Sequence, residues 1–239
     1  MDSSRVPPLR SLPRVFIEIP AEVGDLIDLP PHEFKKFHDV LRLRSGAQVA
    51  VLPNNGQIMR CEMAGRQVKV LEIFDHPTES ARNIHLYQAM PKPEKLEEIV
   101  RMSSELGVAS ITVFESDRSV VRWDGNKKAD RTRRLQSIAI EAAEVSFRAK
   151  YPKIRWMSGV KEVLDQPGST IVLSEGDQIS KTLSEALDGV SEANLVIGPE
   201  GGWAPREVAL IDPFAVTLGP RVLRVDTAAV TACAIALSL

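Results

Sequence analysis

Short apolar runs of strand length dominate the first 75 residues of the chain. Four of them are rich in strand-forming residues and lie at Arg14–Ile19, Gln48–Leu52, Gln57–Met63 and Gln67–Phe74. Turn-forming sequences at Pro53–Gly56 and Ala64–Gly65 separate successive runs. With one helical segment over His32–Leu43, this pattern predicts a small β-barrel over residues 1–75.

A polar, proline-containing stretch at Asp75–Asn83 ends this pattern, and apolar strands then alternate with helical segments. This order is typical of a parallel sheet covered by helices on both faces. We expect strands at Ile84–Met90, Ser110–Phe114, Lys153–Met157, Thr170–Leu173, Asn194–Ile197 and Ala215–Leu218. The expected helices are Glu94–Leu106, Lys127–Phe147, a short segment near Lys161, Ser180–Leu187, Pro205–Ile211 and Thr227–Leu237. The sequence therefore predicts an α/β domain over residues 76–239.

The composition is that of an ordinary globular protein, with 44% apolar and 26% charged residues among 239. No apolar run approaches the roughly 20 residues that span a bilayer, and the first residues lack the order of a secretory signal, so we expect a cytoplasmic protein without membrane contact. Cys61 and Cys233 lie far apart and are expected to be buried. The four histidines show no ligand spacing, and we predict no metal site.

Charge is distributed unevenly along the chain. The segment 118–155 carries eleven cations and four anions, hence +7, whereas the remainder carries −9. Such separation indicates a protein that meets phosphates on one face, although a solvated helix face explains such runs about equally well.

Three predicted strands end in unusual loops: Leu173–Gly176, Ile197–Trp203 and Leu218–Arg224. In an open α/β sheet the ligand lies outside the carboxyl ends of the strands, so these loops can line one site. Their glycines allow the backbone to approach a ligand closely. The spacing fits neither a P-loop nor a dinucleotide fingerprint. The loops therefore predict a small-molecule site built mostly from main chain.

The motifs Gly198-Pro-Glu-Gly-Gly-Trp203 and Leu218-Gly-Pro-Arg-Val-Leu-Arg-Val-Asp-Thr-Ala228, preceded by Glu105-Leu-Gly-Val108 and Glu141-Ala-Ala-Glu144, together carry a resemblance. The chain resembles the bacterial 16S rRNA uracil-N3 methyltransferase family, also called ribosomal RNA small subunit methyltransferase E, of the SPOUT superfamily. The resemblance covers nearly the whole chain, from Pro13 to the last helix.

The resemblance implies an N-terminal PUA-like or OB-like barrel that helps to hold RNA and a parallel-sheet SPOUT domain tied in a trefoil knot. It also implies a homodimer, S-adenosyl-L-methionine as methyl donor, and 16S rRNA within the 30S subunit as partner. The cofactor-binding residues that it implies are Leu173, Ile197, Gly198, Pro199, Glu200, Gly201, Gly202, Leu218, Gly219 and Leu223.

Catalytic and RNA-binding candidates follow from the same resemblance and from the chemistry of methyl transfer. The catalytic candidates are Arg224, which would stabilise a uracil anion, and Asp226 and Glu200, which would act as bases. Asp226 can also act as a helix N-cap, Glu200 can simply tie its loop, and Trp203 is expected to pack. The RNA-binding candidates are Arg14, Arg42, Arg118, Arg131, Arg133, Arg134 and Arg148.

The chain departs from the family pattern at several positions on the expected RNA side. It has Arg101-Met102-Ser103-Ser104 where the family has Gln-Lys-Ala-Thr, and Val145 and Phe147 where it has Gln and Gly. Val225-Asp226 replaces the common Thr-Glu. Two other functions stay open: a SPOUT methyltransferase for another rRNA or tRNA position, and a non-catalytic rRNA-binding assembly factor.

Overall fold

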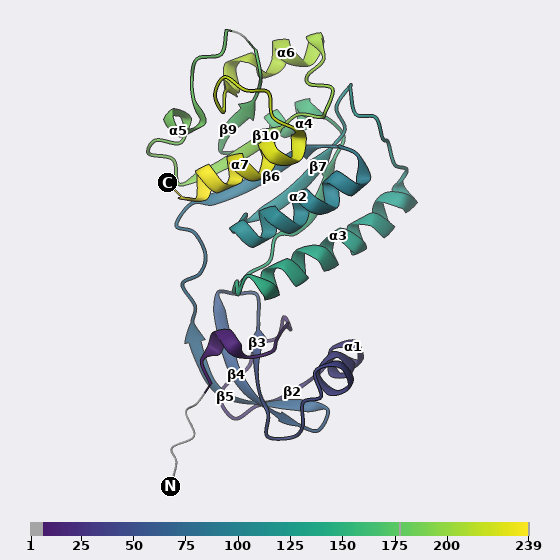
Figure 1. The fold of residues 1–239 in the computed structure, drawn as a ribbon, viewed down its shortest axis with the longest axis vertical. Helices are drawn as coiled ribbons and strands as arrows, with labels where there is room; N and C mark the ends of the chain where they lie inside the picture. The colour runs from purple at the N-terminus through teal and green to yellow at the C-terminus, as the bar shows by residue number, and fades with distance from the viewer. Residues whose placement is uncertain (1–6, 177, 239) are drawn as a thin grey trace. The chain divides into compact units, whose positions relative to one another are not determined.

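The chain forms two compact units in a computed structural model that describes residues 7–176 and 178–238 (Figure 1). The first unit contains the residues up to Glu79 together with Glu144–Lys150, and the second contains Ser80–Ala143 and Tyr151–Leu239. Residues 144–150, which the sequence pattern grouped with the α/β domain, therefore make their contacts in the first unit.

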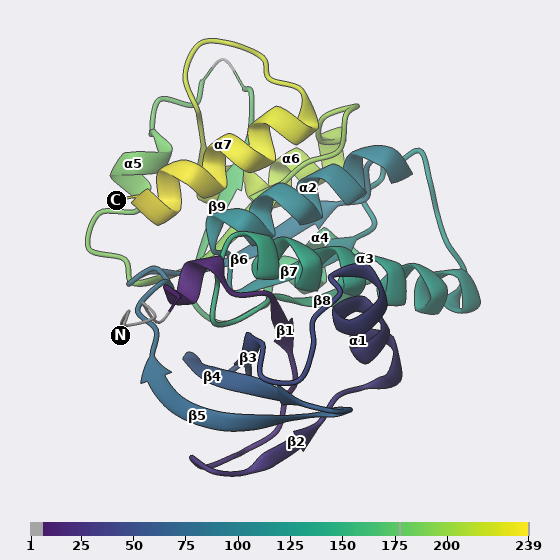
Figure 2. The same ribbon diagram turned by 60° about the horizontal axis from the view of Figure 1, so that its bottom comes forward.

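The first unit is built on a curled five-stranded sheet (Figure 2). Its order is β1 (Arg14–Phe16), β3 (Gln48–Leu52), β4 (Gln57–Ala64), β5 (Gln67–Asp75) and β2 (Leu26–Asp28). The β1–β3 pair is parallel and the other pairs are antiparallel. Alternate side chains of these strands, such as Val49, Val51 and Val68, are fully buried in one core. The sheet confirms the four predicted strands and adds β2.

Short helical turns complete this unit. A 3₁₀ turn, η1, spans Leu9–Ser11, and the predicted His32–Leu43 segment folds as α1 (Pro31–Lys35) followed by a π-helical turn, η2 (Lys36–Val40). Phe37, in η2, is fully buried in the core of the sheet. The sequence therefore located this helical segment, which is shorter than expected.

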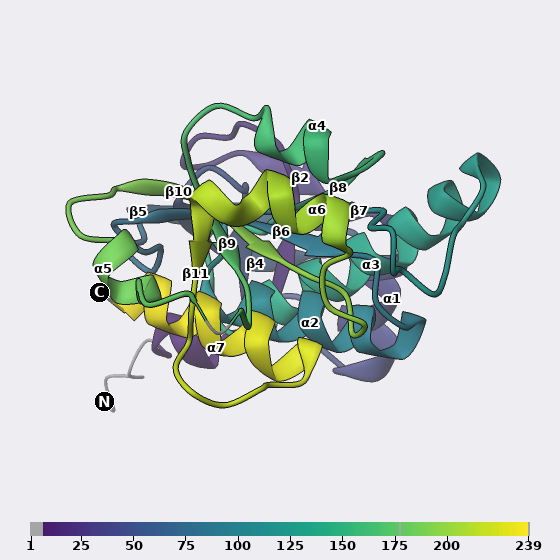
Figure 3. The same ribbon diagram turned by 90° about the horizontal axis from the view of Figure 1, so that it is seen from above.

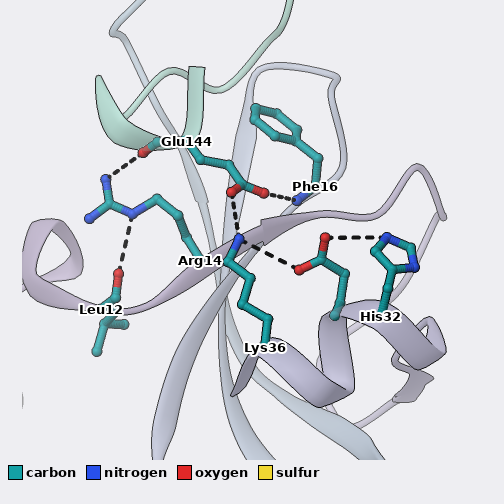
Figure 4. A network of polar contacts seen from close by, with 7 residues as sticks. Leu12, Arg14, Phe16, His32, Lys36 and Glu144 are labelled. Carbon is teal, nitrogen blue, oxygen red and sulfur yellow. Dashed lines mark hydrogen bonds and ion pairs between the residues drawn. The ribbon is translucent and has the colours of Figure 1, made fainter. Parts of the chain in front are cut away.

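The segment Glu144–Lys150 contributes both a buried charge and a buried ring to the first unit. The Glu144 carboxylate accepts hydrogen bonds from Lys36 Nζ at 2.8 Å and from the Phe16 backbone N–H at 3.3 Å (Figure 4). Phe147 packs with Leu12 and Leu52 in a second cluster. Burial raises the pKa of Glu144, against the opposing effect of Lys36. The first unit is thus completed by residues far along the chain.

The second unit contains a six-stranded sheet in which all pairs are parallel. Its order is β11 (Ala215–Val216), β9 (Ser169–Leu173), β10 (Glu192–Ile197), β6 (Asn83–Ala89), β7 (Ser110–Phe114) and β8 (Lys153–Met157). The predicted α/β fold is confirmed. Consecutive strands run outward from β6 through β7 to β8, whereas β9, β10 and β11 lie on its other side. The order therefore reverses beside β6, where ligands of such sheets bind.

Helices cover both faces of this sheet (Figure 3). On one face lie α2 (Pro93–Leu106), α3 (Gly125–Val145), α5 (Leu183–Ala186) and α7 (Val225–Ser238), and on the other lie α4 (Val160–Leu164) and α6 (Pro205–Ile211). A short 3₁₀ turn, η3 (Asp212–Phe214), joins α6 to β11. Leu195 and Ile197 point into the first of these layers, whereas Val196 points into the second. Burial on both faces explains why the strands read as continuous apolar runs.

Residues with positive φ lie at or just beyond the ends of α2 and α3. Helix α2 ends before Gly107, whose φ of +112° is the left-handed conformation that favours glycine at a helix C-cap. Helix α3 was expected to reach Phe147 but ends at Val145, because Phe147 adopts φ +61° and turns its ring into the core of the first unit.

Cys61 and Cys233 are buried free thiols, as expected, and burial raises the pKa of each to about 12. No helix within residues 7–176 and 178–238 has both the length and the apolar character needed to cross a membrane.

Candidate active site

A cavity of about 930 Å³ lies at the carboxyl ends of β9, β10 and β11. The register places Val172 beside Val196 and Leu173 beside Val216, so these three strands end at one edge of the sheet. The segments that follow them, 173–176 with 178–179, 197–203 and 217–225, supply most of the lining. The structure thus brings together the three loops that the sequence singled out.

Eight of the ten residues that the resemblance implied for cofactor binding line this cavity: Leu173, Ile197, Gly198, Pro199, Gly202, Leu218, Gly219 and Leu223. Glu200 and Gly201 do not line it. The Glu200 carboxylate accepts a hydrogen bond from the Lys92 backbone N–H at 3.0 Å, and the Gly201 carbonyl accepts one from Arg118 Nη1 at 2.9 Å. Both residues therefore fasten the outer side of the glycine loop.

Trp203 sits directly behind the glycine loop. Its indole Nε1 donates to the Leu173 carbonyl at 2.9 Å, and its ring stacks on Phe114 with centroids 6.3 Å apart. A Cβ atom on Gly198 would lie only 3.0 Å from Trp203 Cε2. Gly198 is therefore required by close packing of the loop against a fixed ring, and Trp203 is a packing residue.

Polar side chains in or just after the strands hold the loops in place. Gln88, at the end of β6, is fully buried and donates from Nε2 to the Gly198 carbonyl at 3.3 Å. The Thr217 hydroxyl accepts from the Gly219 backbone N–H at 3.0 Å, and Gly219 has φ +113°. Neither Gln88 nor Thr217 was predicted from the sequence, because a single polar residue in or beside an apolar strand gives no sign that it supports a loop.

Arg224 and Asp226, two of the catalytic candidates, differ in their surroundings. Arg224 is exposed and lies between Leu223 and Val225, both of which line the cavity. Asp226, in the first turn of α7, accepts from Lys95 Nζ of α2 at 2.8 Å. This hydrogen bond lowers the pKa of Asp226 and makes its carboxylate a weaker proton acceptor.

Two of the arginines predicted to bind RNA are engaged within the first unit. Arg148 has a side chain only 4% exposed and pairs with Glu79 at 2.6 Å. Arg14 donates to the backbone carbonyls of Leu12 and Glu144 (Figure 4), and its guanidinium lies over the Phe147 ring. Burial lowers the pKa of Arg14. Both side chains therefore have structural contacts that their charge in the sequence did not reveal.

The other predicted RNA-binding arginines lie nearer to solvent. Arg134 and Arg131 pair with Glu97 of α2 at 2.6 and 3.6 Å, and Arg133 pairs with Asp130. Arg42, with φ +57°, and Arg118 are exposed. The charge of the cationic segment is thus partly balanced by nearby carboxylates.

No group of three or more metal-binding side chains occurs among the residues that the structure describes. The second unit is a parallel sheet with a cavity of ligand size at its carboxyl edge, lined by apolar side chains and loop backbone.

Comparisons with known proteins define the class to which this architecture belongs. Residues 78–237 match the model of the RNA methyltransferase domain family, which identifies the second unit as an RNA methyltransferase domain. The ribosomal RNA small subunit methyltransferase E of Mycobacterium bovis is 31% identical over 208 residues, which are 81% of this chain and 79% of that protein. The chain belongs to the ribosomal RNA small subunit methyltransferase E family.

Solved structures agree with this membership. A methyltransferase of Legionella pneumophila in complex with SAM is 29% identical, with a TM-score of 0.85 over 94% of this chain and 96% of its own. The ribosomal RNA small subunit methyltransferase E of Neisseria gonorrhoeae, bound to S-adenosyl methionine, is 26% identical, with a TM-score of 0.82 over 93% and 95% of the two chains. The predicted family and SPOUT fold class are confirmed.

Proposed function

We propose that this protein uses S-adenosyl-L-methionine to methylate N3 of a specific uridine in 16S rRNA of the small ribosomal subunit. The observation that carries the proposal is the cavity formed jointly by the loops of both glycine-proline motifs, in a chain of the ribosomal RNA small subunit methyltransferase E family. The related structures contain the same cofactor.

The cavity suits this cofactor in size and chemistry. Its volume of about 930 Å³ can hold a ligand of this size. Leu173, Leu218 and Leu223 would pack on the adenosyl group, while loop backbone groups would meet its polar atoms. The lining also carries Glu175 and Arg221, which provide both signs of charge for a zwitterionic amino-acid group. When bound, the cofactor supplies an electrophilic methyl group on a sulfonium sulfur.

The protein's own task is to hold the uracil and to favour its N3 anion. Uracil N3 has a pKa about two units above 7, so ionisation costs roughly 3 kcal/mol. Arg224 is the candidate for stabilising this anion, because it is exposed between two residues of the cavity lining and carries a guanidinium that can face a carbonyl oxygen of the base. Asp226 and Glu200, the predicted bases, each use a carboxylate oxygen to hold the chain.

The wider proposal follows from family membership. The first unit would help to hold rRNA, the second would carry the trefoil knot, and the protein would act as a cytoplasmic homodimer on 16S rRNA within the 30S subunit. Arg42, Arg118, Arg131, Arg133 and Arg134 are the candidates for phosphate contact, because their side chains lie at or near the surface.

The test is nucleoside mapping of 16S rRNA from a strain that lacks the protein, complemented with wild type or Arg224→Ala. Wild type should restore one 3-methyluridine. With 30S subunits in vitro, Arg224→Ala should lower the single-turnover rate by about a hundredfold, the scale for loss of one preorganised donor. Arg224→Lys keeps the charge and controls for RNA affinity.

Three outcomes contradict parts of this proposal. A methylated product at another base or in tRNA would change the target, and no methylated product at all would favour the assembly factor. A wild-type rate for Arg224→Ala would place the catalytic arginine elsewhere.

A further inference from the structure

A tight turn after β7 is fixed to the start of α6, which directly follows the glycine loop 198–203. The Glu207 carboxylate, 3% exposed, accepts from the Ser116 hydroxyl and from the Asp117 backbone N–H, each at 3.0 Å. It also accepts from the Ala204 backbone N–H at 3.0 Å. One buried carboxylate therefore ties the turn to the residue that follows Trp203.

The turn is closed by its own hydrogen bonds. The Ser119 hydroxyl accepts from the Ser116 backbone N–H at 3.1 Å, and the Ser116 carbonyl accepts from the Ser119 N–H at 3.0 Å. The backbone of Arg118, inside this turn, is consequently held in one position relative to the glycine loop.

Arg118 crosses the outer side of that loop. Its Nη1 donates to the Gly201 carbonyl at 2.9 Å, and a Cβ atom on Gly201 would lie 3.4 Å from Arg118 Cβ and 3.6 Å from Cδ. The aliphatic stem thus rests on Gly201, while the neighbouring Gly202 lines the cavity. Arg118 thus contacts the glycine loop at a residue that does not line the cavity.

The guanidinium has capacity for a second acceptor. It offers five N–H donors, and within residues 7–176 and 178–238 its hydrogen bonding consists of the contact with Gly201. The side chain is exposed and opens the cationic segment 118–155. A phosphate can accept two parallel hydrogen bonds from an arginine and binds more strongly than a neutral carbonyl.

We propose that Arg118 is a positioning residue that couples RNA binding to cofactor binding, by holding Gly201 and an RNA phosphate at the same time. The inference rests on the proposed function. A phosphate that orders the guanidinium removes the entropy cost of ordering it for the Gly201 contact, so each ligand favours the other. By linkage the cofactor tightens RNA binding by the same factor.

The experiment measures S-adenosylhomocysteine affinity by equilibrium dialysis, without and with saturating 30S subunits from a strain that lacks the protein. For wild type we expect affinity to rise about fivefold or more with the subunits. Arg118→Met should reduce this factor to about one, while affinity without subunits falls by about threefold at most. Arg118→Lys should keep subunit affinity but lose the coupling, because lysine lacks the planar fork.

Arg133→Met is the matched control, because Arg133 is an exposed arginine of the same segment whose partner is Asp130. It should weaken subunit binding and keep the coupling factor. Wild-type coupling in Arg118→Met, or a factor of one in the wild type, overturns the inference and leaves the proposed function standing. If wild type binds neither S-adenosylhomocysteine nor the subunit, the proposed function falls, and the inference with it.

Discussion

Replacing Gly198 by alanine adds one methyl group where the structure has no room for it. The new Cβ would lie 3.0 Å from Trp203 Cε2, 3.2 Å from Nε1 and 3.3 Å from Cζ2, whereas carbon atoms in contact prefer about 3.5–4.0 Å. The indole cannot move back, because Phe114 stacks against it and its Nε1 is bonded to the Leu173 carbonyl. The loop must therefore shift.

The size of the effect follows from this overlap. Overpacking of a buried site costs about 1–3 kcal/mol, so the free energy of unfolding should fall by that amount. A shifted loop also moves Gly198 and Pro199 within the cavity lining. A cost of about 1.4 kcal/mol, which lies within this range, corresponds to a tenfold change in affinity. S-adenosylhomocysteine binding should therefore weaken by about tenfold.

Calorimetry for binding and urea denaturation for stability measure the two effects. Gly125→Ala is the matched control, since a Cβ there meets nothing within 4 Å. Adding Trp203→Phe to Gly198→Ala removes the atoms that clash, so the two changes should be non-additive by about 1 kcal/mol or more. A Gly198→Ala protein as stable as wild type that binds S-adenosylhomocysteine equally well would show that the loop has room for the extra methyl group.

Two further predictions concern buried and paired carboxylates. Glu144→Ala removes the acceptor for Lys36 Nζ and should lower the free energy of unfolding, measured by urea denaturation, by about 1–3 kcal/mol. Glu141 is an exposed residue of the same helix, and Glu141→Ala should change this free energy by less than about 0.5 kcal/mol. Equal effects of the two substitutions would contradict a structural role for Glu144. Asp226→Asn should destabilise the protein near neutral pH, because the pair with Lys95 lowers the pKa of Asp226 in the folded state. A carboxylate with a lowered pKa stabilises the fold at pH values above its ordinary pKa of 3.8, and this stabilisation is lost as the pH falls through the pKa of the folded state. The melting temperatures of wild type and Asp226→Asn, measured against pH, should therefore converge in acid. A difference in melting temperature that does not depend on pH would exclude the pair with Lys95 as its cause.

Much of the fold was predictable because its signals are local. The predicted bounds of Gln48–Leu52, Ser110–Phe114, Lys153–Met157 and Pro205–Ile211 agree with the structure at both ends. Each of these elements is a short apolar or amphipathic run bounded by turn-forming residues, so neighbouring residues suffice to define it. Strand β2 gave no such signal, because only Ile27 of its three residues is buried.

The three loops of the cavity were also predictable, since parallel strands end at one edge and glycine-proline pairs mark the turns that follow. The side on which each loop residue points was not. Glu200 and Gly201 stand in the middle of the motif, yet their partners are Lys92 and Arg118, on loops after other strands. Only the sheet order β9–β10–β6–β7 places those partners there.

Charged residues show most clearly the difference between what could be predicted from the sequence and what depends on the fold. In the sequence Arg148 belongs to a cationic run and Glu144 to a helical motif, and nothing near either residue indicates burial. Arg148 finds Glu79, 69 positions away, and Glu144 finds Lys36, 108 positions away. Most of the helices and strands, the strand-end loops and the overall charge separation could be read from the sequence, because they depend on neighbours along the chain. Which charges are buried in pairs and which stay at the surface follows from the fold alone, because a charge can leave water only where the fold supplies its partner.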